Sequence, residues 1–187
     1  MSIDDLSPDD REALLAERRE EYKSFWPGPH GRRVRYAIEM FPLLQADKPR
    51  GRTLIPATRD MRLRKVVETF GKYFKQELGF DSVPFAAQRS RLYNNDPTVE
   101  VVLFDAQRVT ATFPIAAGAA GLSIQDGERW LDWFWIHPFE RGKGLADKAW
   151  ADLEELYGKQ FRIQPPLSPA MERFLTHHAV APERWRS

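Results

Sequence analysis

Residues 130–150 read WLDWFWIHPFERGKGLADKAW, and this stretch decides the fold. Aromatic and aliphatic side chains dominate 130–136, which predicts a buried strand. A helix is predicted from about Gly144 to Tyr157, because apolar residues recur at three- and four-residue steps before Gly158. Between them, glycines let the backbone approach a ligand closely, and the first amides of the helix have no partners within it. Strand, turn and helix together predict an anion site suited to a pyrophosphate.

Two familiar phosphate-binding loops do not fit the turn Arg141-Gly142-Lys143-Gly144. The P-loop requires a glycine, four residues and then Gly-Lys-Ser/Thr, whereas Leu145 follows Gly144 here. The dinucleotide fingerprint requires a third glycine and a following acidic ribose ligand on a parallel sheet. A different class of phosphate site is therefore expected, and a structural turn that binds nothing is the alternative.

The rest of the chain predicts an α/β sandwich with a mixed sheet. Ser7 to Tyr22 predicts a helix, 33–45 is ambiguous between helix and strand, and 46–57 predicts a connecting loop. A helix over about 59–78 precedes strands at 99–104 and 109–115, a small-residue stretch at 116–121 and a hairpin turn at Asp126-Gly127. After the central helix come a short strand at 161–163 and a last helix, which Ser168 caps and which runs to about His178.

The loop resembles the acyl-CoA signature of the GNAT N-acetyltransferase superfamily, Gln/Arg-x-x-Gly-x-Gly/Ala, at Arg141, Gly144 and Ala146. The resemblance extends over 99–178 and does not cover 1–57. It implies an α/β fold of the α+β type, with a twisted, mostly antiparallel sheet flanked by helices. We expect an N-terminal helical extension over 1–57, which shapes an acceptor site or a homodimer contact, and an acyl-CoA-binding domain over 58–187.

The resemblance also implies the binding residues and acetyl-CoA as the co-substrate. In the family, the loop backbone holds the coenzyme A pyrophosphate, and the preceding strand splays from its neighbour to admit the pantetheine arm. A backbone amide at the strand end, near Ile136, stabilises the acetyl carbonyl. The residues expected to bind the co-substrate are therefore Ile136, Arg141, Gly142, Lys143, Gly144, Leu145 and Ala146.

The catalytic residues depart from the family pattern. Where some members carry a glutamate base, this chain has Trp130, and counting by twos from Ile136 puts Phe134, Asp132 and Trp130 on one face. Asp132 is thus the nearest substitute base, the alternative being an ordinary carboxylate paired with an Arg. The tyrosine that protonates the leaving thiolate in many members corresponds to Phe174, which has no proton to give.

Ser168 is the second catalytic candidate, and capping of the last helix is its alternative role. The indoles of Trp130, Trp133 and Trp135 are expected to form core or cleft wall. His177 and His178 close the last helix, where cations favour the helix dipole, and are expected to be structural.

Composition excludes several classes of protein. The 187 residues include no Cys and four His, which excludes a disulfide scaffold, a cysteine nucleophile and a thiolate metal site. No run approaches the ~18 apolar residues of a membrane span, and the acidic start is unlike a signal peptide. We therefore expect a soluble cytoplasmic protein with no metal.

The net charge of +1 conceals three unlike regions. Residues 1–22 hold three Arg and eight acidic residues, a net of −5; residues 23–75 hold thirteen Lys/Arg and four acidic residues, a net of +9; the remainder carries −3. The function expected is transfer of an acetyl group from acetyl-CoA to an amine on a protein or a small molecule. The alternative is a catalytically weak module that contacts nucleic acid or a protein through 23–75.

Overall fold

The computed structural model describes Ser7, Asp9, Asp10, Glu12, Ala13 and residues 23–27, 33–88, 99–107 and 112–185, with only the backbone described at 23–27 and 33–37. The strands are β1 (Lys23–Pro27), β2 (Arg33–Glu39), β3 (Phe41–Pro42), β4 (Leu54–Pro56), β5 (Val99–Asp105), β6 (Ile115–Gln125), β7 (Glu128–Ile136) and β8 (Arg162–Ile163). The α-helices are α2 (Met61–Leu78), α3 (Leu145–Tyr157) and α4 (Pro169–His177), and the 3-10 helices are η2 (Gln45–Asp47), η3 (Pro138–Glu140) and η4 (Pro182–Arg184).

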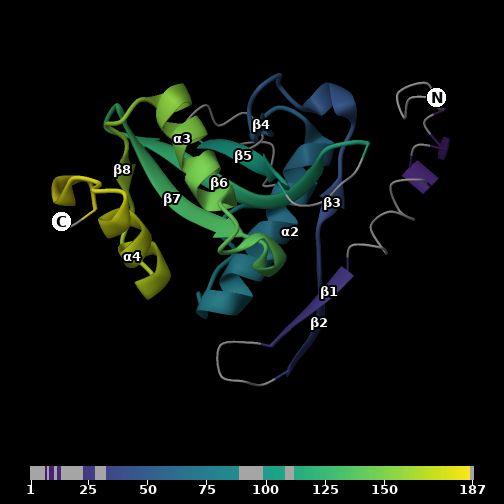
Figure 1. Ribbon diagram of the computed structural model, residues 1–187, viewed down its shortest axis with the longest axis horizontal. Helices are drawn as coiled ribbons and strands as arrows, with labels where there is room; N and C mark the ends of the chain where they lie inside the picture. The colour runs from purple at the N-terminus through teal and green to yellow at the C-terminus, as the bar shows by residue number, and fades with distance from the viewer. Residues whose placement is uncertain are drawn as a thin grey trace.

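A mixed sheet with the order β4-β5-β6-β7-β8 forms the centre of the molecule, and β3 also pairs with β6 (Figure 1). The pairs β3–β6, β4–β5, β5–β6 and β6–β7 are antiparallel, whereas β7 and β8 are parallel. The strands β1 and β2 form a separate antiparallel ribbon that extends away from this sheet. The α+β architecture with a mostly antiparallel sheet agrees with the fold expected from the sequence.

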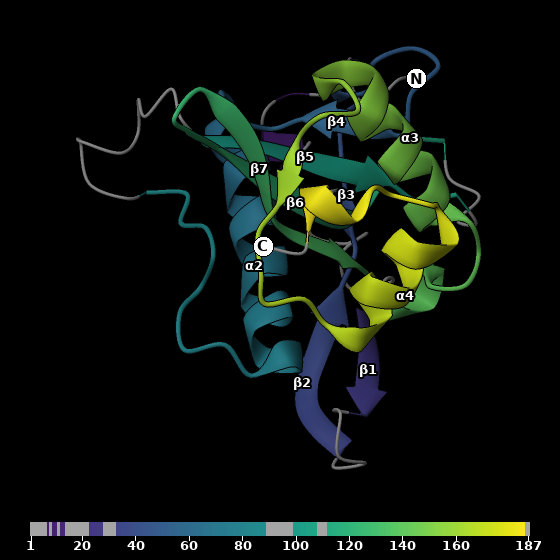
Figure 2. The same cartoon turned by 90° about the vertical axis from the view of Figure 1, so that its left-hand side faces the viewer.

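Helices cover both faces of the sheet, with α2 on one face and α3 and α4 on the other (Figure 2). Trp133 and Trp135 of β7 pack in the core beneath α2 with Phe70, while Leu131 and Ile136 pack in the core beneath α3 and α4. The strand β7 is therefore buried on both faces, which explains its nearly continuous apolar sequence.

The helices predicted at 59–78, 144–157 and 168–178 are confirmed as α2, α3 and α4. Asp60 caps α2 by accepting the amide of Arg62 at 2.7 Å, and Gly79 ends the helix in the left-handed conformation at φ 76°. The hairpin turn is also confirmed, since Asp126 and Gly127 have φ of 51° and 81° between β6 and β7.

The helical extension predicted over 1–57 is wrong for the residues described from Lys23 onward, which form β1 to β4 and η2. In the ambiguous stretch 33–45, pairing with β1 and β6 determines the strand conformation, because an extended segment satisfies its backbone groups only beside another strand. Both β3 and β4 belong to the central sheet. The domain boundary expected between residues 57 and 58 therefore falls just after a strand of that sheet. Most of the helix expected over Ser7 to Tyr22 lies outside the described residues.

The small-residue stretch at 116–121 forms the middle of β6. A Cβ at Gly121 would lie 2.2 Å from Nε1 of Trp133, and one at Gly118 would lie 2.6 Å from the carbonyl oxygen of Trp135. Small residues here allow the bulky β7 to pack directly against β6. Of the strand expected at 109–115, residues 109–111 lie outside the described chain, residues 112–114 are not in a strand, and Ile115 begins β6.

Candidate active site

The strands β7 and β8 separate after a very short pairing. Only Trp130–Arg162 and Leu131–Ile163 are in register, followed by a hydrogen bond of 2.9 Å from the amide of Gln164 to the carbonyl of Leu131. The chain then turns away through Pro165-Pro166. Among the described residues, no strand pairs with the remainder of β7 on this edge. The two strands therefore form an open V near the middle of β7.

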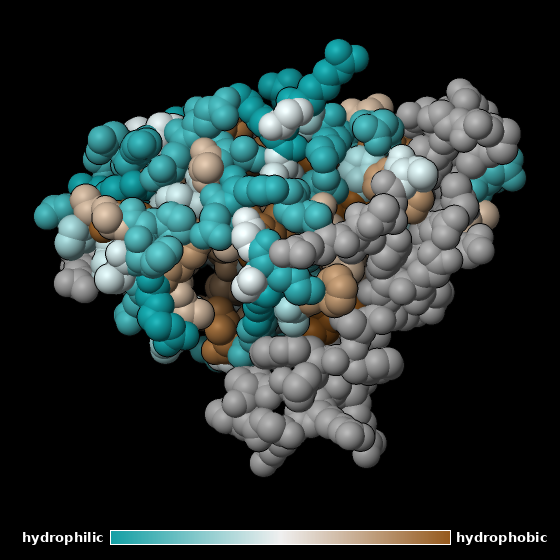
Figure 3. Space-filling view, viewed as in Figure 1, coloured by the Kyte–Doolittle hydropathy of each residue, from teal (hydrophilic) through white to brown (hydrophobic). Residues whose placement is uncertain are grey.

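A narrow cavity of about 50 Å³ lies in this V. Its lining comes from the end of α2, from β7 and from the β8–α4 connection, and it includes both catalytic candidates, Asp132 and Ser168. Phe74 and Trp133 line it from the α2 side of the sheet, whereas Met171 lines it from α4. On the α3–α4 side, Figure 3 shows a hollow with hydrophobic residues at its floor between the positions of these two helices. The cavity thus joins elements from both faces of the sheet.

A β-bulge places Asp132 at the cavity. Gly121 pairs with Trp133 and the next residue of β6, Leu122, pairs with Leu131, so Asp132 is the extra residue of β7. Leu131 and Trp133 consequently pack in opposite cores, although they are two residues apart. The prediction that one alternating face runs from Ile136 through Asp132 to Trp130 is therefore wrong, because the bulge shifts the alternation.

The carboxylate of Asp132 has a hydroxyl as its partner. Ser123 Oγ of β6 donates to Asp132 Oδ1 at 2.9 Å, and among the described residues no Arg lies within ion-pair distance of this carboxylate. The side chain keeps contact with solvent, yet desolvation by the surrounding chain raises its pKa, against the smaller lowering effect of the Ser123 hydrogen bond. A carboxylate with a raised pKa is a better proton acceptor than an ordinary surface Asp.

Ser168 both caps α4 and lines the cavity. Its Oγ accepts the amide of Met171 at 3.2 Å, which confirms the capping role and leaves the hydroxyl hydrogen directed elsewhere. Phe174 packs against Phe134, Trp150 and His178, with ring centroids 6.3, 5.5 and 4.3 Å away. Its ring belongs to the packing between α4, α3 and β7.

Both glycines of the turn before α3 adopt a left-handed backbone conformation. Gly142 and Gly144 have φ of 67° and 86°, and Gly144 is the N-cap of α3 without a side-chain capping bond. The first backbone amides of α3 therefore donate no capping hydrogen bond to a side chain at Gly144. Asp147 of the first turn pairs at 2.9 Å with Nε2 of His178, a contact that draws its carboxylate toward α4.

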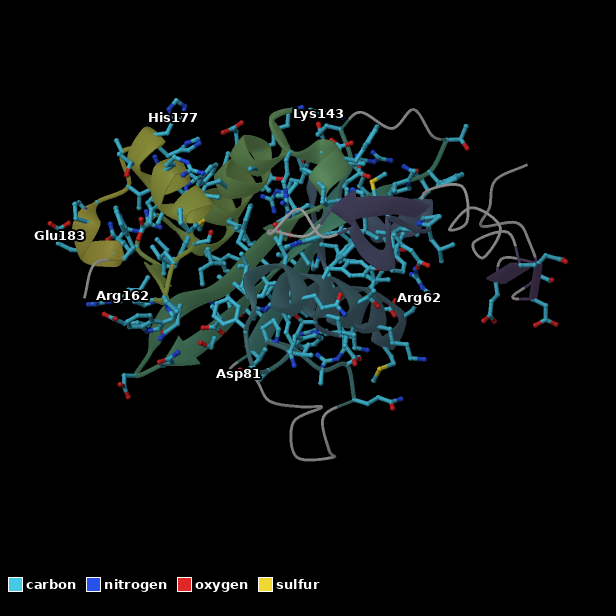
Figure 4. The ribbon with its side chains drawn as sticks, turned by 90° about the horizontal axis from the view of Figure 1, so that it is seen from below. Arg62, Asp81, Lys143, Arg162, His177 and Glu183 are labelled. Carbon is cyan, nitrogen blue, oxygen red and sulfur yellow. The ribbon has the colours of Figure 1, made fainter. Side chains whose placement is uncertain are left out.

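Lys143 and Arg141 have different positions in this turn. Lys143 Nζ lies 3.7 Å from the ring centroid of the half-exposed Phe139, and in Figure 4 Lys143 points outward from the molecule. The guanidinium of Arg141 is directed toward α2: Nη1 and Nη2 each donate to Glu77 at 2.6 Å, and Nε donates to the Ile136 carbonyl at 2.8 Å. Arg141 therefore connects the end of β7 to the last turn of α2.

Glu77 is a residue that sequence reasoning missed. Besides Arg141, it accepts the indole Nε1 of Trp135 at 2.8 Å, so one mostly buried carboxylate receives three donors. Nothing in the sequence marks this acid, because its partners lie 58 and 64 positions away. Glu77 therefore binds Trp135, near the end of β7, and Arg141, the first residue of the glycine turn.

The Glu77–Arg141 pair is expected to show a coupling free energy of about 1 kcal/mol, because the pair is bidentate but partly screened by solvent. The measurement is a double-mutant cycle in urea with Glu77→Gln, Arg141→Gln and the double variant. The ion pair of Glu128 and Arg162, at 2.7 Å with both side chains more than 40% exposed, is the control and should show weaker coupling. Equal coupling free energies in the two cycles would contradict a stabilising role for the Glu77–Arg141 pair.

His137 follows β7 and is fully buried. Its Nδ1 accepts the amide of Phe139 at 3.1 Å, and Nε2 lies 3.5 Å from the carbonyl oxygen of Ile38, so the neutral ring carries its hydrogen on Nε2. Burial lowers the pKa of His137 to about 4, outweighing the opposite effect of the Ile38 carbonyl. The ring thus acts as a neutral link between β2, β7 and η3.

Metal binding and membrane crossing find no support in the described part of the chain. Its His, Asp and Glu residues form no group of three or more that is arranged to hold a metal ion. Among the helices described above, none is long and apolar enough to cross a membrane.

Comparisons with known proteins show a similarity of fold. No protein-family model matches the chain, and no curated protein sequence matches it significantly. A proposed acyl-CoA N-acyltransferase from Klebsiella pneumoniae has a similar structure, with a TM-score of 0.42 and 16% identity over 67% of this chain and 79% of that one. A proposed GNAT-family acetyltransferase from Bacteroides thetaiotaomicron gives a TM-score of 0.38 and 16% identity over 76% and 69%. The structural similarity is thus to proteins described as proposed acyltransferases, at low sequence identity.

Proposed function

We propose that this chain binds acetyl-CoA and transfers the acetyl group to an amine. One observation carries the proposal: β7 and β8 diverge after two paired residues around a cavity lined by Asp132 and Ser168. A slender thioester arm requires such an opening, since closed parallel pairing would fill the sheet there. The glycine turn at the N-terminus of α3 follows the same strand and offers amides to the phosphates.

The residues of the glycine turn and of the start of α3 would contribute to pyrophosphate binding in different ways. The amides of Leu145 and Ala146 belong to the first turn of α3, and the left-handed Gly144 leaves them open to a ligand. Lys143 adds a positive charge at the outer side. Arg141 was expected to bind the co-substrate, and its contacts with Glu77 and Ile136 support a positioning role instead.

The acetyl carbonyl is proposed to accept a hydrogen bond from β7. The amide of His137 donates to Ala117 on β6 at 2.8 Å, so alternation directs the amides of Ile136 and Phe134 toward the open edge. Phe134 lines the cavity, whereas Ile136 does not. The amide of Phe134 is therefore the better candidate for stabilising the developing oxyanion, and Ile136 is nearer the turn.

The reaction then follows from the cavity's polar groups. Asp132 accepts a proton from the ammonium form of the acceptor, and the neutral amine that results attacks the acetyl carbonyl. The new C–N bond forms, the C–S bond breaks, and the second proton lost by the nitrogen passes to the coenzyme A sulfur, which leaves as the thiol. Ser168 contributes a hydroxyl that can donate a hydrogen bond to the sulfur as negative charge develops on it. Phe174 takes no part in proton transfer.

Ion pairing weighs against the alternative of nucleic-acid binding through the basic middle of the chain. Cations that would contact phosphates are already engaged by acids of the same chain: Lys48 with Asp105, Arg52 with Glu155, Arg62 with Asp47 and Lys72 with Glu68. Buried Arg64 donates to the carbonyls of Thr58 and Ala87. Asp105 and Glu155 lie outside 23–75, so the pairs of Lys48 and Arg52 offset two of the charges that make up the net +9, while the other pairs hold their cations beside acids of the same region.

Calorimetric titration with acetyl-CoA tests the proposal, and Gly144→Val tests the binding turn. At φ 86° a β-branched residue is strained, so the turn must shift and the Kd for acetyl-CoA should rise at least about tenfold. The control is Gly51→Val, at φ 76° and with nothing within 4 Å of the position that a Cβ would take, which should leave the Kd unchanged. Absence of binding to the unaltered protein at millimolar acetyl-CoA would overturn the proposal.

A further inference from the structure

The acceptor side of the cavity has apolar, aromatic walls. Phe74 and Phe80 stack with centroids 5.1 Å apart and an interplanar angle of 10°, and Phe74 also contacts Trp133 at 5.8 Å. All three line the cavity together with Leu78, whose side chain at the end of α2 is 41% exposed. An apolar surface beside a catalytic carboxylate would bind a flat or aliphatic group carried next to the reacting amine.

The cavity offers one carboxylate to a cationic ligand. Asp132 is the acidic residue in its lining, where the other polar side chains are Gln164 and Ser168. Glu77, on the adjacent turn of α2, is occupied by three donors from Arg141 and Trp135. One carboxylate matches one ammonium group, whereas a polyamine would leave its further charges against apolar walls.

The glycine turn, which is proposed to bind acetyl-CoA, and the apolar wall of Phe74, Leu78 and Phe80 lie on opposite sides of the sheet. In Figure 4, Lys143 of the glycine turn points to one side, and Asp81, which follows the wall residue Phe80, lies at the other. The cavity contains residues from both sides. A ligand could therefore reach Asp132 from the α2 side while the thioester enters from the side of α3 and α4.

We propose that the acceptor is a small primary monoamine carried on an aromatic or aliphatic group, bound against the surface that Phe74, Leu78 and Phe80 form, with its nitrogen at Asp132. This inference rests on the proposed acetyl transfer, and it specifies the acceptor at the same site. Burial of the apolar group supplies affinity, and the single carboxylate fixes the position of the nitrogen.

The test compares 2-phenylethylamine with spermidine as acceptors at saturating acetyl-CoA. We expect kcat/KM for 2-phenylethylamine to be at least about tenfold higher, as burial of an aromatic group implies. Leu78→Glu adds a second carboxylate at the wall and should reduce this ratio at least about tenfold. Leu156→Glu is a matched control, because Leu156 on α3 is also 41% exposed but does not line the cavity.

Binding of the amine is measured separately by nuclear magnetic resonance, with acetyl-CoA absent. Broadening of the 2-phenylethylamine signals by the unaltered protein and by Leu156→Glu, but not by Leu78→Glu, supports the proposed wall. Equal kcat/KM for both amines, preference for spermidine, or acetylation of neither amine by protein that binds acetyl-CoA would overturn the acceptor class. Failure of acetyl-CoA to bind in the calorimeter overturns the proposed function instead, so the two failures are distinguishable.

Discussion

Replacement of Asp132 by Asn is expected to slow acetyl transfer by roughly 10²-fold or more while leaving the Kd for acetyl-CoA unchanged. The amide keeps the shape of the side chain and can still contact Ser123, but it cannot accept a proton from the amine. The glycine turn that is proposed to hold the phosphates lies beyond the end of β7 and does not contact this side chain. The measurement is steady-state kinetics with an amine acceptor, combined with calorimetric titration of acetyl-CoA.

The pH dependence adds a second criterion for Asp132. Since desolvation raises its pKa, the acid limb of kcat/KM should lie above the ordinary Asp value of 3.8, and this limb should disappear in Asp132→Asn. Asp126→Asn is the control, because Asp126 lies in the exposed β6–β7 turn at φ 51°, a conformation that Asn tolerates well. An unchanged rate in Asp132→Asn would exclude this residue as the base.

The sequence predicted β7, the glycine turn and α3 because each has a dense local pattern. Apolar residues fill β7, the stripe with Ala149 and Leu153 follows helical spacing, and Gly158 ends the helix. Ser168 could likewise be predicted as a helix cap, because its hydroxyl oxygen accepts the backbone amide of Met171, three residues later in the chain. Interactions within one element or one turn can be inferred from neighbouring residues alone.

The parts that were not predicted depend on pairing between distant residues. The bulge at Asp132 exists because β7 has one residue more than β6 between two register positions, and no residue type near Asp132 marks that difference. The three donors at Glu77 come from positions far along the chain. The ambiguous stretch 33–45 becomes strand through its partners, β1 and β6, since short apolar runs have no preference strong enough to decide.

Acidification is expected to destabilise the protein through His137. Its pKa is about 4 in the folded state and about 6.5 in the unfolded chain, so between these values the unfolded state binds more protons. The free energy of unfolding should therefore be highest above pH 6.5 and fall as the pH decreases toward 4. The loss attributable to this one ring is about 3 kcal/mol, because each tenfold shift in proton affinity corresponds to about 1.4 kcal/mol.

Urea denaturation between pH 4 and 7 measures this effect, with His137→Gln as the informative variant. A carboxamide can accept from Phe139 and donate to Ile38 without titrating, so the variant should lose the part of the pH slope that the ring contributes, whatever its stability at pH 7. The slope from carboxylates is common to both proteins and cancels in the difference. His177→Gln, at an exposed position on α4, should keep the full slope. Equal slopes in the unaltered protein and His137→Gln would mean that the buried ring does not set the acid limit of the fold.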